Sequence, residues 1–240
     1  MSVTTRARGS VSGTADRPAR GPAALGGLLS ALAYLVLLFA GVVFSVALAK
    51  GAYPPPTASV EEILRWRIDN AAVVRIAGVA VGLSGLALIW FAAWLGAVVG
   101  RLGNTSASLL TFAGGLISGG FLLLSSILHW VEQRPETLEQ PPLMRTLHQL
   151  IFVTGGPGFV AGLTLLSGAS SIALIRARLA PVWLGVIGVA ASVLSPLALL
   201  ALIPEGGNLF AVIPVGRFLS MVWMLLLAVI VGRRLAARPR

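Results

Sequence analysis

Three side chains that could bind a metal ion lie near one another in the middle of the chain. His129 and Glu132 are three residues apart and would share one face of a helix, and His148 follows after a polar, proline-containing loop. Two imidazoles and one carboxylate are enough ligands for a zinc ion, and the two histidines could alternatively be axial haem ligands. The H-x-x-E spacing is common, and both histidines fall at the ends of apolar segments. We therefore favour solvated side chains at a membrane surface and expect no cofactor.

Arg217 is a second candidate, because it lies just inside an apolar segment. A charge at mid-depth in a bilayer costs about 2.5–3.5 kcal/mol, and less near the edge. Together with Arg75 and Glu205, Arg217 could form an outward-facing polar vestibule that binds an anion or a substrate carboxylate. The simpler alternative is that Arg217 reaches to lipid headgroups or pairs with Glu205. The sequence favours this alternative.

A glycine- and proline-rich break interrupts the fourth apolar segment at Gly155, Gly156, Pro157 and Gly158. Proline and glycine there predict a kinked or interrupted helix. Transporters use interrupted helices to present a helix end to a ligand, but a simple kink is the favoured interpretation. The break does not match a phosphate-binding loop, because it has no lysine and follows no strand.

Other catalytic chemistry finds little support in the sequence. The absence of cysteine excludes thiolate chemistry and disulfides, and the single lysine, Lys50, falls outside the apolar segments. The serines within apolar segments have no histidine or acid near them at a plausible depth, so we expect them to bond to the helix backbone. We therefore expect a protein that is not an enzyme.

The composition requires lipid as the solvent. The chain has 240 residues, of which 57% are hydrophobic and 11% charged, with a mean hydropathy of +0.92. Soluble domains carry about 25% charged residues. We predict an all-α bundle with six transmembrane helices, each about 20 residues or more, in a domain spanning 23–232. The predicted spans are 23–49, 76–100, 102–128, 157–175, 181–203 and about 213–232.

Several segments fall outside these spans. We predict basic tails at 1–22 and 233–240, and we expect the tail at 1–22 to be disordered. Ser59 and Glu62 form a capping-box pattern that opens a helix over 60–70, which we expect to lie at the membrane interface or to extend the second span. The segment 143–154 is less apolar than its neighbours, so it could lie at the surface, re-enter the membrane or belong to span four.

The positive charges predict the orientation. With six spans, one face of the membrane carries eleven basic residues and only Asp16, and the other face carries seven basic and seven acidic residues. The basic face is the cytoplasmic one, so both termini lie inside. The eleven are Arg6, Arg8, Arg17, Arg20, Arg101, Arg176, Arg178, Arg233, Arg234, Arg238 and Arg240. The net charge of +10 then indicates anionic lipid headgroups as partners rather than nucleic acid.

Small residues one helical turn apart recur in the spans, as in Gly78-x-x-x-Gly82 and Gly115-x-x-x-Gly119. This spacing allows helices to approach closely. We expect packing within one chain, and the same motifs leave a homo-oligomer or another membrane-protein partner open.

The layout resembles a family of uncharacterised, actinobacterial-type six-span membrane proteins, a domain of unknown function. The resemblance covers roughly 23–232 and depends on the glycine-rich fourth span, the link through Arg176 and Arg178 into Pro181, and Pro214-x-Gly216-Arg217. It implies a multi-pass protein of the bacterial cytoplasmic membrane and supplies no catalytic residues. We expect a scaffold, accessory or sensor subunit. The alternatives are a small transporter or channel with the vestibule at Arg75 and Arg217, and a metalloprotein or enzyme using the two histidines and Glu132.

Overall fold

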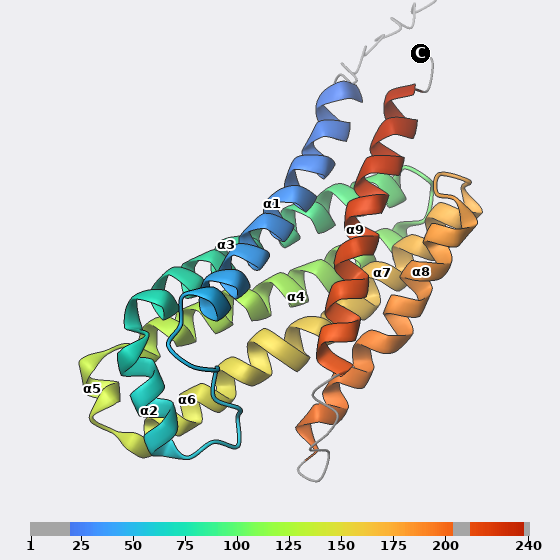
Figure 1. The fold of residues 1–240 in the computed structure, drawn as a ribbon. Coiled ribbons are helices and arrows are strands. Elements are labelled where there is room, and N and C mark those ends of the chain that lie inside the picture. Colours follow the sequence, from blue (N-terminus) through green and yellow to red (C-terminus); the bar gives the residue numbers. More distant parts are fainter. Residues whose placement is uncertain (1–19, 204–211, 238–240) are drawn as a thin grey trace, which may run out of the picture.

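The computed structural model describes residues 20–203 and 212–237, and these form helices and connecting turns without a strand (Figure 1). The elements are α1 (Arg20–Ala47), α2 (Val60–Asp69), α3 (Ala71–Gly100), α4 (Thr105–Glu132), α5 (Pro135–Leu138), α6 (Pro141–Val153), the π-helical turn η1 (Thr154–Gly158), α7 (Phe159–Arg176), α8 (Val182–Leu194), the 3₁₀ helix η2 (Ser195–Leu202) and α9 (Val212–Ala237). The predicted first tail, apart from its last residues, and Glu205 lie outside the described residues.

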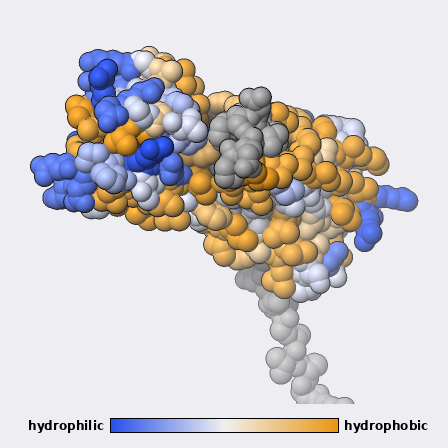
Figure 2. Space-filling view, turned by 90° about the horizontal axis from the view of Figure 1, so that it is seen from below, coloured by the Kyte–Doolittle hydropathy of each residue, from blue (hydrophilic) through white to orange (hydrophobic). Residues whose placement is uncertain are grey.

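Within the described residues, six helical segments are long and apolar enough to cross a membrane. They are Leu25–Ala47, Ala71–Gly100, Thr105–Glu132, Pro141–Arg176, Val182–Leu202 and Ile213–Leu235. Each corresponds to one predicted span, so the prediction of an all-α, multi-pass chain is confirmed. Figure 2 shows hydrophilic side chains gathered at the two ends of the bundle and mainly hydrophobic ones between them. Such an apolar belt with polar ends is typical of a helical membrane protein.

Close packing between neighbouring helices depends on glycine. α3 packs along α4, and α4 packs along α7. A Cβ atom on Gly85 would lie 2.6 Å from the carbonyl oxygen of Gly119, and one on Gly114 would lie 2.4 Å from the amide nitrogen of Leu166. Both neighbours are backbone atoms that no side-chain movement can clear. Glycine spacing therefore serves helix packing within the chain, as expected.

Residues 143–154 continue directly into the fourth span, because α6, η1 and α7 form one helical segment over Pro141–Arg176. The chain does not turn back before the break, so the re-entrant alternative is wrong. The predicted break is a π-helical turn containing Pro157, whose missing N–H removes one α-helical hydrogen bond without ending the helix. Irregularity also appears at Ser195, where α8 gives way to 3₁₀ geometry next to Pro196.

Both described ends of the chain lie at the same end of the bundle, where α1 begins and α9 ends (Figure 1). Arg234 Nη1 there donates to the carbonyl oxygen of Arg178, at 2.8 Å, which joins the end of α9 to the turn between α7 and α8. Both ends of a chain lie on the same side when the chain crosses the bundle an even number of times. At the opposite end, α2, α5 and α6 form a polar group of helices that we call the cap. The predicted N-terminal capping bond of α2 is confirmed, because Glu62 N donates to Ser59 Oγ at 3.2 Å.

Candidate functional site

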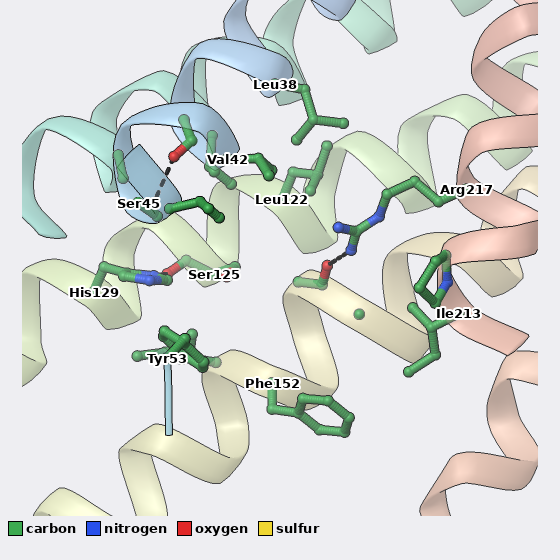
Figure 3. A pocket seen from close by; sticks show the side chains of 18 of the residues that line it. Leu38, Val42, Ser45, Tyr53, Leu122, Ser125, His129, Phe152, Ile213 and Arg217 are labelled. Carbon is green, nitrogen blue, oxygen red and sulfur yellow. Dashed lines mark hydrogen bonds between the residues drawn. The ribbon is translucent and has the colours of Figure 1, made fainter. Parts of the chain in front are cut away.

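A pocket of about 580 Å³ lies inside the half of the bundle that carries the cap. α1 and α9 form two of its walls, and α3, α4, α6 and η1 form its floor (Figure 3). Its volume falls within the range of about 300–1,000 Å³ found for small-molecule sites. The lining residues are Leu38, Gly41, Val42, Ser45, Val46, Gly51, Ala52, Tyr53, Ala77, Val81, Leu122, Ser125, His129, Ile151, Phe152, Gly155, Gly156, Ile213, Pro214 and Arg217.

Arg217 is the one arginine or lysine among these lining residues. Its Nη2 donates to the carbonyl oxygen of Gly155, and its guanidinium carbon lies 5.3 Å from the centre of the Phe159 ring (Figure 3). Its Nε is buried and has no hydrogen-bond partner among the described residues. A carbonyl dipole and a ring face offset only part of the cost of a charge in apolar surroundings. The guanidinium therefore retains capacity to bind an anion.

The π-helical turn explains why the Gly155 carbonyl is available to Arg217. In a regular α-helix this oxygen would accept from the amide of Phe159. That amide donates instead to the carbonyl oxygens of Thr154 and Gly156. The predicted break thus contributes directly to the pocket, because it frees a backbone acceptor that fixes the position of the Arg217 side chain.

His129 lies on the opposite side of the pocket, one turn along α4 from Ser125 (Figure 3). Its Nδ1 is 2.8 Å from the carbonyl oxygen of Ser125. A carbonyl can only accept, so Nδ1 carries the proton and, in the neutral ring, Nε2 is the acceptor. Ser45 Oγ, on α1, is occupied by a bond to the carbonyl oxygen of Gly41 at 2.8 Å.

A buried ion pair lies beside the pocket at the cap. Arg67 Nη2 is 3.0 Å from Glu132 Oε2, and neither side chain is exposed. The same Nη2 donates to the hydroxyl of Tyr53 at 2.9 Å and lies 3.2 Å from His148 Nδ1. His148 Nδ1 must therefore accept, and Nε2 donates to the carbonyl oxygen of Pro54 at 3.1 Å. We call Tyr53, Arg67, Glu132 and His148 the ion-pair cluster.

Tyr53 belongs both to this cluster and to the pocket lining. The residue is 42% exposed, and its ring stacks on His148 with centroids 5.3 Å apart and meets the Trp66 ring edge-on at 5.1 Å. Its hydroxyl, however, faces Arg67. Burial of that end raises the pKa of Tyr53 above its ordinary value of 10.0, and the Arg67 charge opposes the rise.

The three predicted metal ligands do not form a metal site. Arg67 occupies the carboxylate of Glu132, both ring nitrogens of His148 have protein partners, and His129 is turned to the carbonyl oxygen of Ser125. Glu132 and His148 do approach each other, with Oε1 3.8 Å from Nδ1. In the described part of the chain, no group of three or more histidine, aspartate or glutamate residues could hold a metal ion. The same bonds leave His148 no free nitrogen for a haem.

Only some of the residues predicted for the vestibule and the helix break line the pocket. Arg217 lines the pocket, as do Gly155 and Gly156 of the predicted break, whereas Pro157 and Gly158 are buried beside it. Arg75 is exposed on α3 and does not line the pocket. Sequence reasoning missed Arg67 and Tyr53. Arg67 follows Ile63 by four residues and lies next to Trp66, on the buried face of α2, whereas its exposed neighbour Arg65 lies off that face, so helical spacing is the signal that could have identified it.

Comparisons of the chain with protein-family models, with curated proteins and with solved structures gave no match. The resemblance to the six-span bacterial family therefore stays a prediction, and the functional argument depends on the geometry of the pocket.

Proposed function

We propose that this chain is a non-enzymatic membrane protein that binds an organic anion at Arg217, in a pocket facing the outer side of the membrane. One observation carries the proposal: a guanidinium with a buried, unpaired Nε lies in the wall of a pocket of ligand size. In residues 20–203 and 212–237, no acidic side chain forms an ion pair with it. A bound carboxylate or phosphate would supply the missing negative charge and would accept from the part of the guanidinium that lines the pocket.

Binding is favoured over catalysis by what surrounds His129. Histidine is the residue type most often used as a general acid or base, and His129 is the one histidine among the lining residues. Its Nδ1 is held by a backbone carbonyl, and no hydroxyl among the described residues bonds to its Nε2. A nucleophile paired with a base is the usual signature of covalent catalysis. This pocket instead combines one cation with mainly apolar walls, which suits recognition of a ligand.

The orientation follows from charge. Arg178 and Arg234 lie together at the end of the bundle opposite the cap. The predicted basic face of the chain includes both residues, and the positive-inside rule assigns such a face to the cytoplasm. We therefore infer that both termini are cytoplasmic, that α2 lies at the outer surface and that the membrane is the bacterial cytoplasmic membrane. The resemblance noted above agrees with this location.

The experiment is a binding assay on the purified full chain, with decanoate and phenyl phosphate as probes and thermal stabilisation as the readout. R217Q removes the charge while keeping a donor for Gly155, and R75Q is the matched control, because Arg75 is exposed away from the pocket. We expect R217Q to weaken binding at least about tenfold, as for a lost charge-assisted hydrogen bond, and R75Q to leave it unchanged.

Two results would count against the proposal. One is stabilisation of wild type and R217Q to the same extent. The other is a large gain in anion binding in E205Q, because it would show that Glu205 already neutralises Arg217 within the chain.

The π-helical turn favours a carrier as the second candidate function. Such turns occur often at functional sites, and this one lies against the ligand pocket in the middle of a span. Uptake of labelled decanoate into proteoliposomes that depends on Arg217 would distinguish a carrier from a protein that only binds.

A further inference from the structure

We propose that the anion is the head of a single-chain amphiphile, a lipid-type carboxylate or phosphate, and that it enters the pocket from the bilayer rather than from water. This inference rests on the proposed function, because it assigns a ligand class and a route to the same Arg217 site. Three observations carry it: a closed side toward water, an apolar side toward lipid and a single cation within an apolar pocket.

The side toward water is closed by residues 48–58, the strap between α1 and α2. Gly51, Ala52 and Tyr53 of the strap line the pocket. Asn70 holds the strap at Lys50 through two hydrogen bonds, in which Lys50 N donates to Oδ1 at 2.6 Å and Nδ2 donates to the Lys50 carbonyl oxygen at 3.2 Å.

Three more contacts fasten the strap to the cap. Trp66 Nε1 donates to the carbonyl oxygen of Gly51 at 3.3 Å. The hydroxyl of Tyr53 accepts from Arg67, and the carbonyl oxygen of Pro54 accepts from His148. Because the last two donors belong to the buried ion-pair cluster, opening this side would disturb a charged pair that has no access to water.

The side of the pocket between α1 and α9 is apolar. Figure 1 shows these two helices diverging toward the cap, and the pocket lies between them. On the α1 side, Val42 is 38% and Val46 is 78% exposed, and Ile213 and Pro214 line the α9 side. This flank belongs to the hydrophobic belt between the polar ends. A water-borne anion would have to cross the belt to reach Arg217, whereas an amphiphile already resides there with its head near this depth.

The pocket interior matches the same ligand class. Its lining is mainly aliphatic, and Arg217 is its single permanent cation among the lining residues. Burying an alkyl chain contributes about 0.8 kcal/mol for each CH₂ group, and one head group satisfies the guanidinium. Carboxylate and phosphate heads both accept from a guanidinium in a fork geometry, so the two head groups share the recognition chemistry.

The test uses the full chain in nanodiscs of zwitterionic lipid with a fluorescent polyene fatty acid as the probe. The competitors are hexadecanoate, hexadecyl phosphate, hexadecanol, acetate and inorganic phosphate. We expect the first two to displace the probe, and hexadecanol to be at least about tenfold weaker because it lacks the anionic head. R217Q should remove this preference for the anionic head, and acetate and phosphate should not compete.

The route is measured by association rates. V46W narrows the flank between α1 and α9 and should slow probe association several-fold, whereas V186W, at an exposed valine on α8, should leave the rate unchanged. N70A removes the two hydrogen bonds that hold the strap at Lys50, at a residue outside the pocket lining, and should not accelerate entry.

The outcomes separate the two proposals. Acetate or phosphate competing as well as hexadecanoate, or hexadecanol binding as well as hexadecanoate, would overturn the amphiphile. Acceleration in N70A without slowing in V46W would overturn the route from the bilayer. Arg217-dependent binding of the small anions alone would refute this inference and leave the proposed function standing. Absence of any Arg217-dependent binding would refute both.

Discussion

Neutralising Glu132 tests whether the ion-pair cluster holds the cap onto the bundle. The substitution E132Q keeps the shape of the side chain and removes its charge. It leaves the Arg67 guanidinium fully buried, with Nε and Nη1 already lacking hydrogen-bond partners. The amide oxygen introduced by E132Q, the hydroxyl of Tyr53 and the Nδ1 of His148 would remain as acceptors for it among the described residues. None of the three carries a full negative charge, so the buried cation loses its counter-ion.

The expected cost is large, because removing one partner of a buried ion pair destabilises a protein by about 3–5 kcal/mol. For a chain of this size, 1 kcal/mol corresponds to about 2–4 °C in the unfolding temperature, so E132Q should unfold roughly 6–20 °C lower than wild type. The reciprocal change, R67M, should cost a similar amount. The double variant R67M/E132L removes both charges and should recover much of the loss, with a coupling energy of about 2–3 kcal/mol.

The assay is thermal unfolding of the purified protein followed by tryptophan fluorescence, with hydrogen exchange to locate the effect. Trp66 packs against Arg67 and reports on the cap. Exchange should accelerate in α2 and α6 before it does in α3 or α7. The matched control is E136Q, because Glu136 pairs with Arg134 at 3.7 Å on the exposed surface, and such a pair contributes less than about 1 kcal/mol. Equal shifts in E132Q and E136Q, or strictly additive effects in the double variant, would refute the reasoning.

Three further predictions follow from packing, pH and topology. G85A should destabilise the bundle by about 1–3 kcal/mol in thermal unfolding, because its Cβ would meet a backbone carbonyl of α4, whereas G120A, with open space at its Cβ, should be neutral or stabilising by up to about 1 kcal/mol. Burial raises the pKa of Tyr53, so its neutral hydroxyl contributes stability that is fully present below about pH 10 and is lost as the pH rises further. Wild type should therefore lose stability faster than Y53F between about pH 10 and 12. Parallel stability curves for the two proteins would contradict this. In the cysteine-free chain, a membrane-impermeant maleimide applied to intact cells should label S59C and not R178C, and the reverse would invert the proposed orientation.

The spans could be predicted from the sequence because one strong physical requirement decides them. Every backbone group in the bilayer core must bond internally, so long apolar segments become helices whatever their neighbours do. The fourth span shows where that reasoning stops. Composition alone could not decide whether 143–154 continues into the glycine-rich break, because the outcome depends on whether Pro157 ends the helix or is accommodated in a π-helical turn, as it is here.

The site was only half predictable for a related reason. Arg217 could be identified because a charge within a span is costly wherever it points. Glu132 and His148 were correctly expected near each other, but the metal hypothesis omitted Arg67, which reaches the same carboxylate from another helix. Helical spacing places Arg67 on the buried face of α2 with Ile63 and Trp66, so its burial could have been predicted. Its pairing with Glu132 could not, because it depends on how α2 docks beside α6 and the end of α4.

The two polar regions of the bundle act on each other through Tyr53. Its hydroxyl accepts from the buried Arg67, and its ring forms part of the pocket wall that also contains His129. A ligand that fills the pocket would therefore pack against a residue whose position the ion pair determines. If the cluster fixes the strap, E132Q should weaken binding of the fatty-acid probe even though Glu132 does not line the pocket. R67M/E132L should recover stability without fully restoring binding, because it lacks the Arg67 donor that holds the Tyr53 hydroxyl. Binding that depends on Arg217 alone, and is the same in E132Q and R67M/E132L as in wild type, would show that the cap and the pocket are independent parts of the molecule.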